Sequence, residues 1–370
     1  MSGEPGILPL QRAHEELGAD FVDALGFSVS GDYGDPEAEV CAVRDSVGLF
    51  DQSYRGVLDL LGDGVQAMLH GVFSSNVASL TDGTGQPSCL LNAKGRLVAA
   101  FMLYRLSTDH FRIMTYEPLR ESFIKSAQRY ALLSDIDVKD ATTEARVLSL
   151  QGPAAESILR SVSASTVALP GTREITQLDV GGATVPVVRG GESPEGGFEL
   201  WVREDSLASV WDRLVRALES TNGALCGYRA AEVLRVEAGR ARYGIDYNDD
   251  SFPNEIGWEH SLTFDKCYVG QEIVARMRTY GEVNRKLRGL VVDAAAELPV
   301  GAIVRSGDDE AGVVTSSVYS ARLGKRLAVA TIKRRHWTAA TLVVDGIGGD
   351  CSTEQTDLPF VRLDGSVNSG

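Results

Sequence analysis

The chain has 370 residues, enough for two or three domains of ~100–200 residues each. Its 36 Lys and Arg residues against 51 Asp and Glu residues give a formal charge of −15. That charge disfavours a nucleic-acid binder, because affinity for phosphates comes mostly from basic side chains. The longest apolar run, residues 97–104, is shorter than the ~20 residues of a membrane span, and no charged segment precedes an apolar signal core. We therefore expect a cytoplasmic protein without a nucleic-acid or membrane partner.

Helix and strand patterns alternate in the N-terminal third. Asp35 and Pro36 predict the start of a helix, because Asp caps free N–H groups and Pro suits the first helical position. A stripe of valines at helical spacing continues this helix as far as Gly48. The other elements expected here are strands over 56–61, 89–91, 96–106 and 111–114, a helix after Asp63 and a helix from Pro118.

The rest of the chain ends in a β-rich segment. The middle predicts strands over 145–150, 184–188 and 198–202, and helices over 154–162, 206–218 and 229–236. Residues 246–253 are polar and rich in turn formers, so we expect a surface connector. From Arg288 onward, short strands alternate with Gly and Asp turns over 290–292, 303–305, 312–316, 327–332 and 341–344. This pattern predicts a small β-barrel or sandwich after an α+β region.

Metal and nucleotide motifs are missing. The five cysteines form no CxxC pair and the five histidines are scattered, so we expect no metal site. No helix pattern follows the glycine-rich residues 345–349, which therefore predict a turn between strands rather than a phosphate loop.

One segment has an unusual combination of residues. Residues 265–272, Asp-Lys-Cys-Tyr-Val-Gly-Gln-Glu, predict a polar turn that leads into a helix. Cys267 would lie just before the helix N-terminus and beside Lys266, and both features stabilise a thiolate. A small cysteine that packs at the helix start fits the same spacing.

This segment resembles the K-G-C-Y-x-G-Q-E signature of YgfZ-type folate-binding proteins, which are relatives of the glycine-cleavage T-protein (aminomethyltransferase). Asp265 and Lys266 stand here in place of Lys-Gly. Further similar segments are GLFDQS at 48–53, LRVEAG at 234–239, GVVTS at 312–316 and LPF at 358–360. The resemblance implies an α+β, three-domain ring around a folate-sized opening, with a C-terminal β-barrel. We place the first domain at 1–54 and 144–245, the second at 55–143, a connector with the cysteine motif at 246–284 and the barrel at 285–370.

The resemblance also implies site residues. Glu195 begins the segment EGGFEL, where T-proteins have the carboxylate that accepts the donor pair of the pteridine, although an exposed turn glutamate is the alternative. Arg235 would contact folate or pair structurally with Glu232 or Glu237. Cys267 is the candidate catalytic thiolate. The residues that would support it are Lys266, Tyr268, Gly270, Gln271 and Glu272. The tyrosine that precedes the glutamate in T-proteins has no counterpart.

One departure from the T-protein pattern concerns catalysis. The acidic turn G-G-x-x-D-D of T-proteins corresponds to residues 95–100, where Ala99 and Ala100 replace the acids. Alanine exchanges no proton, and general acid–base help is worth ~10²–10⁴-fold, so aminomethyl transfer is disfavoured.

The resemblance therefore implies a tetrahydrofolate-binding YgfZ-like protein that supports iron–sulfur enzymes, with iron–sulfur proteins or their assembly factors as partners. Two alternatives stay open. One is a folate-dependent aminomethyltransferase or demethylase that uses another acid, such as Asp82 or Glu117. The other is an interaction scaffold whose folate pocket has lapsed.

Overall fold

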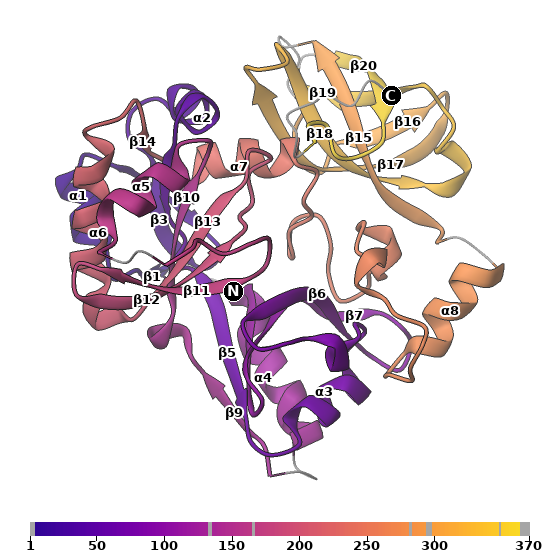
Figure 1. Cartoon of the computed structure of the whole chain (residues 1–370). Coiled ribbons are helices and arrows are strands. Elements are labelled where there is room, and N and C mark those ends of the chain that lie inside the picture. The colour runs from indigo at the N-terminus through magenta and orange to yellow at the C-terminus, as the bar shows by residue number, and fades with distance from the viewer. Residues whose placement is uncertain are drawn as a thin grey trace.

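The computed structural model describes residues 4–131, 135–164, 167–280, 283–293, 298–347 and 349–362. Figure 1 shows three parts around a centre: a six-stranded sheet with its helices, a five-stranded sheet with its helices, and a closed barrel. The predicted α+β ring with a C-terminal β-barrel is confirmed. The domain limits given above stay a prediction.

The first part pairs a strand from the N-terminal region of the sequence with strands from the middle of the chain. The six-stranded sheet has the order β11-β12-β13-β10-β4-β14, so β4 (Gly48–Asp51) pairs with β10 (Arg146–Gln151). The other strands are β11 (Ile175–Val180), β12 (Ala183–Arg189), β13 (Gly197–Val202) and β14 (Ala224–Leu225). Its helices are α1 (Gln11–Glu16), α2 (Pro36–Asp45), α5 (Ala155–Val162), α6 (Glu204–Leu218) and α7 (Tyr228–Glu237). Leu49, Leu148, Leu200 and Trp211 form the centre of its core.

A small sheet of β1 (Gly6–Ile7), β2 (Asp20–Ala24) and β3 (Phe27–Asp32) lies beside this part. Asp35 caps α2 by accepting from the backbone N–H groups of Glu37 and Ala38, so the predicted helix start is confirmed. The predicted end is wrong, because α2 stops at Asp45 and Gly48 begins β4 instead. A Cβ at Gly48 would lie 2.4 Å from Val43, so close packing explains the glycine.

The second part is built on the antiparallel order β6-β7-β8-β5-β9. Its strands are β5 (Arg55–Leu61), β6 (Thr84–Leu91), β7 (Leu97–Ser107), β8 (His110–Tyr116) and β9 (Asp137–Asp140). Its helices are α3 (Val65–Val72), α4 (Glu117–Ala131) and the short η1 (Val77–Ser79) and η2 (Thr142–Glu144). The predicted strands and helices of this part are confirmed.

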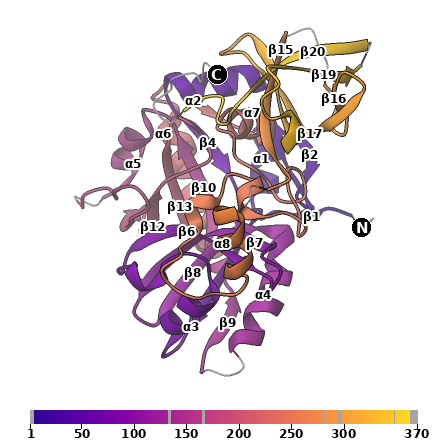
Figure 2. The same cartoon turned by 90° about the vertical axis from the view of Figure 1, so that its right-hand side faces the viewer.

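The connector and the barrel complete the ring. The connector holds η3 (Pro253–Glu255), η4 (Glu259–Ser261) and α8 (Gln271–Tyr280), and Figure 2 shows α8 in front of the second part. The barrel closes in the order β15-β18-β17-β16-β19-β20. Its elements are β15 (Arg285–Asp293), β16 (Ile303–Ser306), β17 (Asp309–Ser320), β18 (Lys325–Lys333), η5 (Arg334–His336), β19 (Thr341–Gly346) and β20 (Gly349–Thr356).

The expectation of a surface connector over 246–253 is confirmed only for residues 248–250, which are exposed. Asp246, Tyr247 and Ser251 are all buried, because the segment runs between the barrel and the second sheet. No described helix has both the length and the apolar character that crossing a bilayer would need.

Candidate functional site

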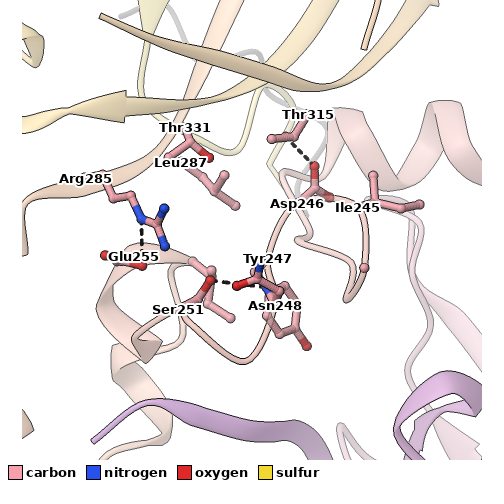
Figure 3. A pocket seen from close by; sticks show the side chains of 12 residues that line it. Ile245, Asp246, Tyr247, Asn248, Ser251, Glu255, Arg285, Leu287, Thr315 and Thr331 are labelled. Atoms are coloured by element: carbon pink, nitrogen blue, oxygen red, sulfur yellow. Dashed lines mark hydrogen bonds and ion pairs between the residues drawn. The ribbon is translucent and has the colours of Figure 1, made fainter. Parts of the chain in front are cut away.

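A cavity of about 180 Å³ lies between the connector and the barrel (Figure 3). The connector residues that line it are Gly244, Ile245, Asp246, Tyr247, Asn248, Ser251, Glu255 and Ile256, and the barrel residues are Arg285, Leu287, Thr315 and Thr331. Arg285 donates to Glu255 over 3.3 Å on one side of the cavity. Burial raises the pKa of Glu255, although Arg285 opposes this effect. The lining is therefore polar, with Tyr247 as its one aromatic side chain.

Asp246 anchors the opposite side of the cavity. Its carboxylate accepts from the hydroxyls of Thr315 and Ser316 on β17, each at 2.7 Å. It also accepts from Nη1 of Arg235 at 2.6 Å, and neither side chain of this pair is exposed. Because a buried charge is costly unless it is paired, these bonds fix the connector between α7 and the barrel.

A line of alternating charges continues from Arg235 toward the second part. Arg235 donates to Glu232 one turn earlier on α7, at 3.0 Å for the closest pair. Glu232 also accepts from Nη1 of Arg242, whose side chain is fully buried. Nη2 of Arg242 then donates to Glu192 over 3.2 Å. Acidic and basic side chains therefore alternate from Asp246 to Glu192, and each one is hydrogen-bonded to the next.

Glu192 is the last residue of this line of charges, and it contacts two strands of the second part. It accepts from Tyr116 Oη on β8 at 3.2 Å and from Arg55 Nη1 on β5 at 3.5 Å. Burial alone would raise the pKa of Glu192, but Arg242 and Arg55 outweigh it and hold the pKa below its usual value. Glu192 is therefore an anion in a buried setting, close to the aromatic rings of Tyr54, Tyr116 and Tyr228.

One donor in this line of charges, Nε of Arg242, has no partner. Arg242 Nε is buried without a hydrogen-bond partner, although the other two nitrogens of this guanidinium donate to Tyr228, Glu232 and Glu192. A buried donor without a partner costs free energy unless a ligand or a water molecule accepts from it.

Glu195 and Arg235 have partners within the protein. Only 11% of the Glu195 side chain is exposed, so it is not an exposed turn residue. It accepts from Ser193 at 2.6 Å and from Arg322 at 3.2 Å, and Arg44 lies 3.8 Å away. Arg235 uses all three guanidinium nitrogens on protein acceptors.

The cysteine motif forms a turn on the second part. Cys267 is exposed and lies four residues before α8 begins. Lys266 donates Nζ to the carbonyl oxygens of His70 and Phe73 at the end of α3. Gln271 closes the turn by donating to the carbonyl of Lys266 at 2.5 Å.

The other motif residues have different surroundings. Tyr268 is buried with its hydroxyl unpartnered, and burial raises its pKa. Gly270 has φ +80°, and a Cβ there would lie 2.5 Å from the carbonyl oxygen of Asn92. Glu272 is exposed and pairs with Arg276 one turn later on α8.

The two alanines that replace acids are buried. Ala99 is 1% exposed in the core of the second part, and Ala100 is 4% exposed in a cluster that includes Tyr247 and Tyr268. The substitute acids are engaged elsewhere, since Asp82 pairs with Arg105 at 2.6 Å and Glu117 pairs with Arg120. Among the described residues, no three His, Cys, Asp or Glu side chains converge as a metal site.

Two family models together match most of the chain. The GCVT N-terminal domain matches residues 10–266, and the glycine cleavage T-protein C-terminal barrel domain matches residues 285–362. The chain belongs to the glycine cleavage T-protein family. The barrel match coincides with the closed barrel of the structure, which begins at β15.

Several relatives are named aminomethyltransferase. A protein named aminomethyltransferase from Rubrobacter xylanophilus is 31% identical over 88% of this chain and 86% of its own length. One from Streptomyces avermitilis is 28% identical over 98% of this chain and 99% of its own length. The crystal structure of aminomethyltransferase T of the glycine cleavage system from Bartonella henselae has a TM-score of 0.87 at 21% identity, covering 97% and 98% of the two chains. That last similarity shows the T-protein fold.

Sequence reasoning missed the buried line from Asp246 to Glu192. Its residues and their partners are distant in sequence, up to 137 positions for Arg55 and Glu192. One signal was available, because Glu192 stands in the same glycine-rich turn as Glu195, three residues earlier.

Proposed function

We propose that this protein binds a reduced folate beside Glu192, with the cavity of Figure 3 receiving part of the ligand. A carboxylate that stays ionised can accept the paired N–H donors of a pteridine. The observation that carries the proposal is the buried Glu192 anion, held between Arg242 and Arg55 with a donor of Arg242 still unused. Glu195 is the second candidate, since it is also mostly buried and accepts from Ser193 and Arg322.

The residues of the cluster fit such a group. The rings of Tyr116 and Tyr228 lie close to this carboxylate with the Arg242 guanidinium over both, and the Tyr54 ring packs edge-on against Tyr228. The cavity of about 180 Å³ is below the ~300–1,000 Å³ that encloses a drug-sized ligand, so most of a folate would lie outside it. Bound tetrahydrofolate would supply a nucleophilic nitrogen that accepts a one-carbon unit.

A calorimetric titration with tetrahydrofolate tests the proposal. Glu192→Gln should weaken binding at least about tenfold, because it replaces a buried anion with a neutral amide. Glu195→Gln, the matched variant in the same turn, should change binding less than about threefold. Absence of binding by the wild type would reject folate binding. The opposite ranking of the variants would assign the pteridine to Glu195.

We also propose that the bound folate is not used for aminomethyl transfer. The support is the pair of buried alanines on β7, with Asp82 and Glu117 already paired to arginines. The transferase is the second candidate, because relatives similar over nearly the whole chain are named aminomethyltransferase. Formation of methylene-tetrahydrofolate from a methylamine donor would establish it.

For the cysteine motif we propose the YgfZ-like role, support of iron–sulfur enzymes through the Cys267 thiol. Its exposure on the turn before α8 supports this role, since a partner can reach the sulfur. In cells that lack the protein, wild type but not Cys267→Ser should restore the activity of an iron–sulfur hydratase. Exposed Cys41 gives the matched variant, Cys41→Ser, which should restore it fully.

A further inference from the structure

A second, larger depression lies on the other side of α7. This groove of about 580 Å³ shares no residue with the cavity of Figure 3. It is formed by β2, the start of α2, the first turns of α7 and the end of β17. The residues that line it are Val22, Asp23, Asp35, Pro36, Glu37, Tyr228, Arg229, Glu232, Val233, Val318 and Tyr319. Its volume is within the ~300–1,000 Å³ range of sites that hold small organic ligands.

The floor of the groove is apolar and aromatic. Val22, Val233 and Val318 come from three different elements, so the groove spans the small N-terminal sheet, α7 and the barrel. All three are only partly buried, which leaves their methyl groups accessible to a ligand. The ring of Tyr319 adds a face that attracts a cation, and Tyr228, which already has Arg242 over its ring, adds apolar ring surface.

The rim carries negative charge that the protein leaves uncompensated. Arg229, the one cation among the lining residues, is already shared by Asp20 at 2.8 Å and by Asp32. Among the residues that the structure describes, no Lys, Arg or His side chain pairs with Asp23, Asp35 or Glu37. Asp35 accepts only from backbone N–H groups of α2. The groove therefore combines an apolar floor with three carboxylates that lack a counter-ion.

We propose that this groove binds a small organic amine, with its aliphatic or aromatic body on the three valines and its ammonium group between Asp23 and Glu37. Apolar area drives such binding, and the carboxylates select a cation over a neutral or anionic ligand of the same shape. The site goes beyond folate binding and does not depend on it.

The test uses 4-phenylbutylamine with two ligands of the same shape, 4-phenylbutan-1-ol and 4-phenylbutyrate. In protein with labelled valine methyl groups, the amine should shift the NMR signals of Val22, Val233 and Val318. The alcohol should bind about three- to tenfold more weakly, which is the size of effect that two exposed ion pairs give, and the acid more weakly still. Equal binding of amine and alcohol would overturn the proposal, as would no binding of the amine.

Variants locate the site independently of the spectra. The double variant Asp23→Asn/Glu37→Gln should weaken amine binding about three- to tenfold and leave the alcohol unchanged. Both residues are exposed, so the fold should tolerate the change. Asp212→Asn, at an exposed carboxylate on α6 outside the groove, is the matched control and should change neither ligand. An effect of Asp212→Asn equal to that of the double variant would mean that net charge alone attracts the amine, and the proposal would be wrong.

Discussion

Arg235 and Arg242 are fully buried, and each lies between two carboxylates. A buried ion pair contributes little compared with apolar packing, but removal of one partner leaves a charge without compensation. At the scale of the single residue, the stability of this region therefore depends on the acids that face these two arginines.

Asp246→Asn tests this dependence. The amide would leave Arg235 with only Glu232 as an anionic partner, so we expect the free energy of unfolding to fall by about 3 kcal/mol. Asp212→Asn, at an exposed carboxylate, should change it by less than ~0.5 kcal/mol. Urea unfolding of both variants gives the comparison, and a loss below about 1 kcal/mol for Asp246→Asn would show that the pair does not matter for folding.

The sequence indicates parts of this cluster but not their connection. Pairing of Arg235 with Glu232 follows from the spacing of one helical turn, and the sequence predicts it as one alternative to a contact between Arg235 and folate. The polar residues around Asp246 predicted a segment exposed to solvent. Nothing in the local sequence shows that Thr315 and Ser316, about 70 residues later, cover this carboxylate. Burial of a polar segment depends on contacts distant in sequence, which composition and periodicity do not contain.

At the scale of the element, Lys266 determines how the cysteine turn is attached. Its ammonium group lies at the C-terminal end of α3, where the last carbonyl groups attract a cation. Burial nevertheless lowers its pKa from 10.5 to about 8. The folded protein thus binds fewer protons than the unfolded chain between about pH 8 and 10.5, so stability should rise with pH across that window.

Comparison with Lys266→Met isolates this effect. The methionine cannot titrate, so the difference in unfolding free energy, wild type minus variant, should increase from about pH 8 to pH 10.5. Denaturant titrations at several pH values measure it. If the difference in unfolding free energy stays constant over this window, Lys266 keeps an ordinary pKa, and its contacts with α3 leave the ammonium group hydrated.

Gly270 joins the same turn to the loop before β7. Gly270 and Gly257 have similar backbone angles, φ +80° and +76°, but only Gly270 has a close neighbour, 2.5 Å from its missing Cβ. Gly257→Ala should therefore cost only the left-handed penalty of ~1–2 kcal/mol. Gly270→Ala should cost at least about 1 kcal/mol more and should speed alkylation of Cys267. Equal losses in thermal or urea unfolding would show that the turn is not packed against residues 92–95.

Sequence patterns predict elements with a strong apolar period better than polar ones. The strands of the second part were expected because they carry long apolar stretches between turn-forming residues, as in β7, which is apolar from Leu97 to Tyr104. The N-terminal sheet and β20 were missed, since β2 (DFVDA) lacks an alternating pattern and β20 (GDCSTEQT) carries few apolar residues. Both gain their order from neighbouring strands.

At the scale of the whole molecule, Glu237 attaches the barrel to the first part. It ends α7 with no exposed side-chain surface, and it accepts from Arg44 on α2 and from Ser320 at the end of β17 at 2.6 Å. Arg322, two residues after Ser320, extends the same contact to Glu195. Glu195 therefore contributes to the attachment of the barrel in this structure.

Glu237→Ala should speed hydrogen exchange in the barrel and leave hydrogen exchange in the second sheet unchanged. Removal of the carboxylate leaves Arg44 buried without its main partner, which we expect to cost about 3–5 kcal/mol, whereas Glu237→Gln retains an acceptor and should cost less. Hydrogen exchange followed by mass spectrometry should show faster exchange for residues 316–332 of the barrel and unchanged exchange for residues 97–116 of the second sheet. Faster exchange in both regions would mean that the ring opens only by global unfolding, so that the barrel is not a separate unit of stability.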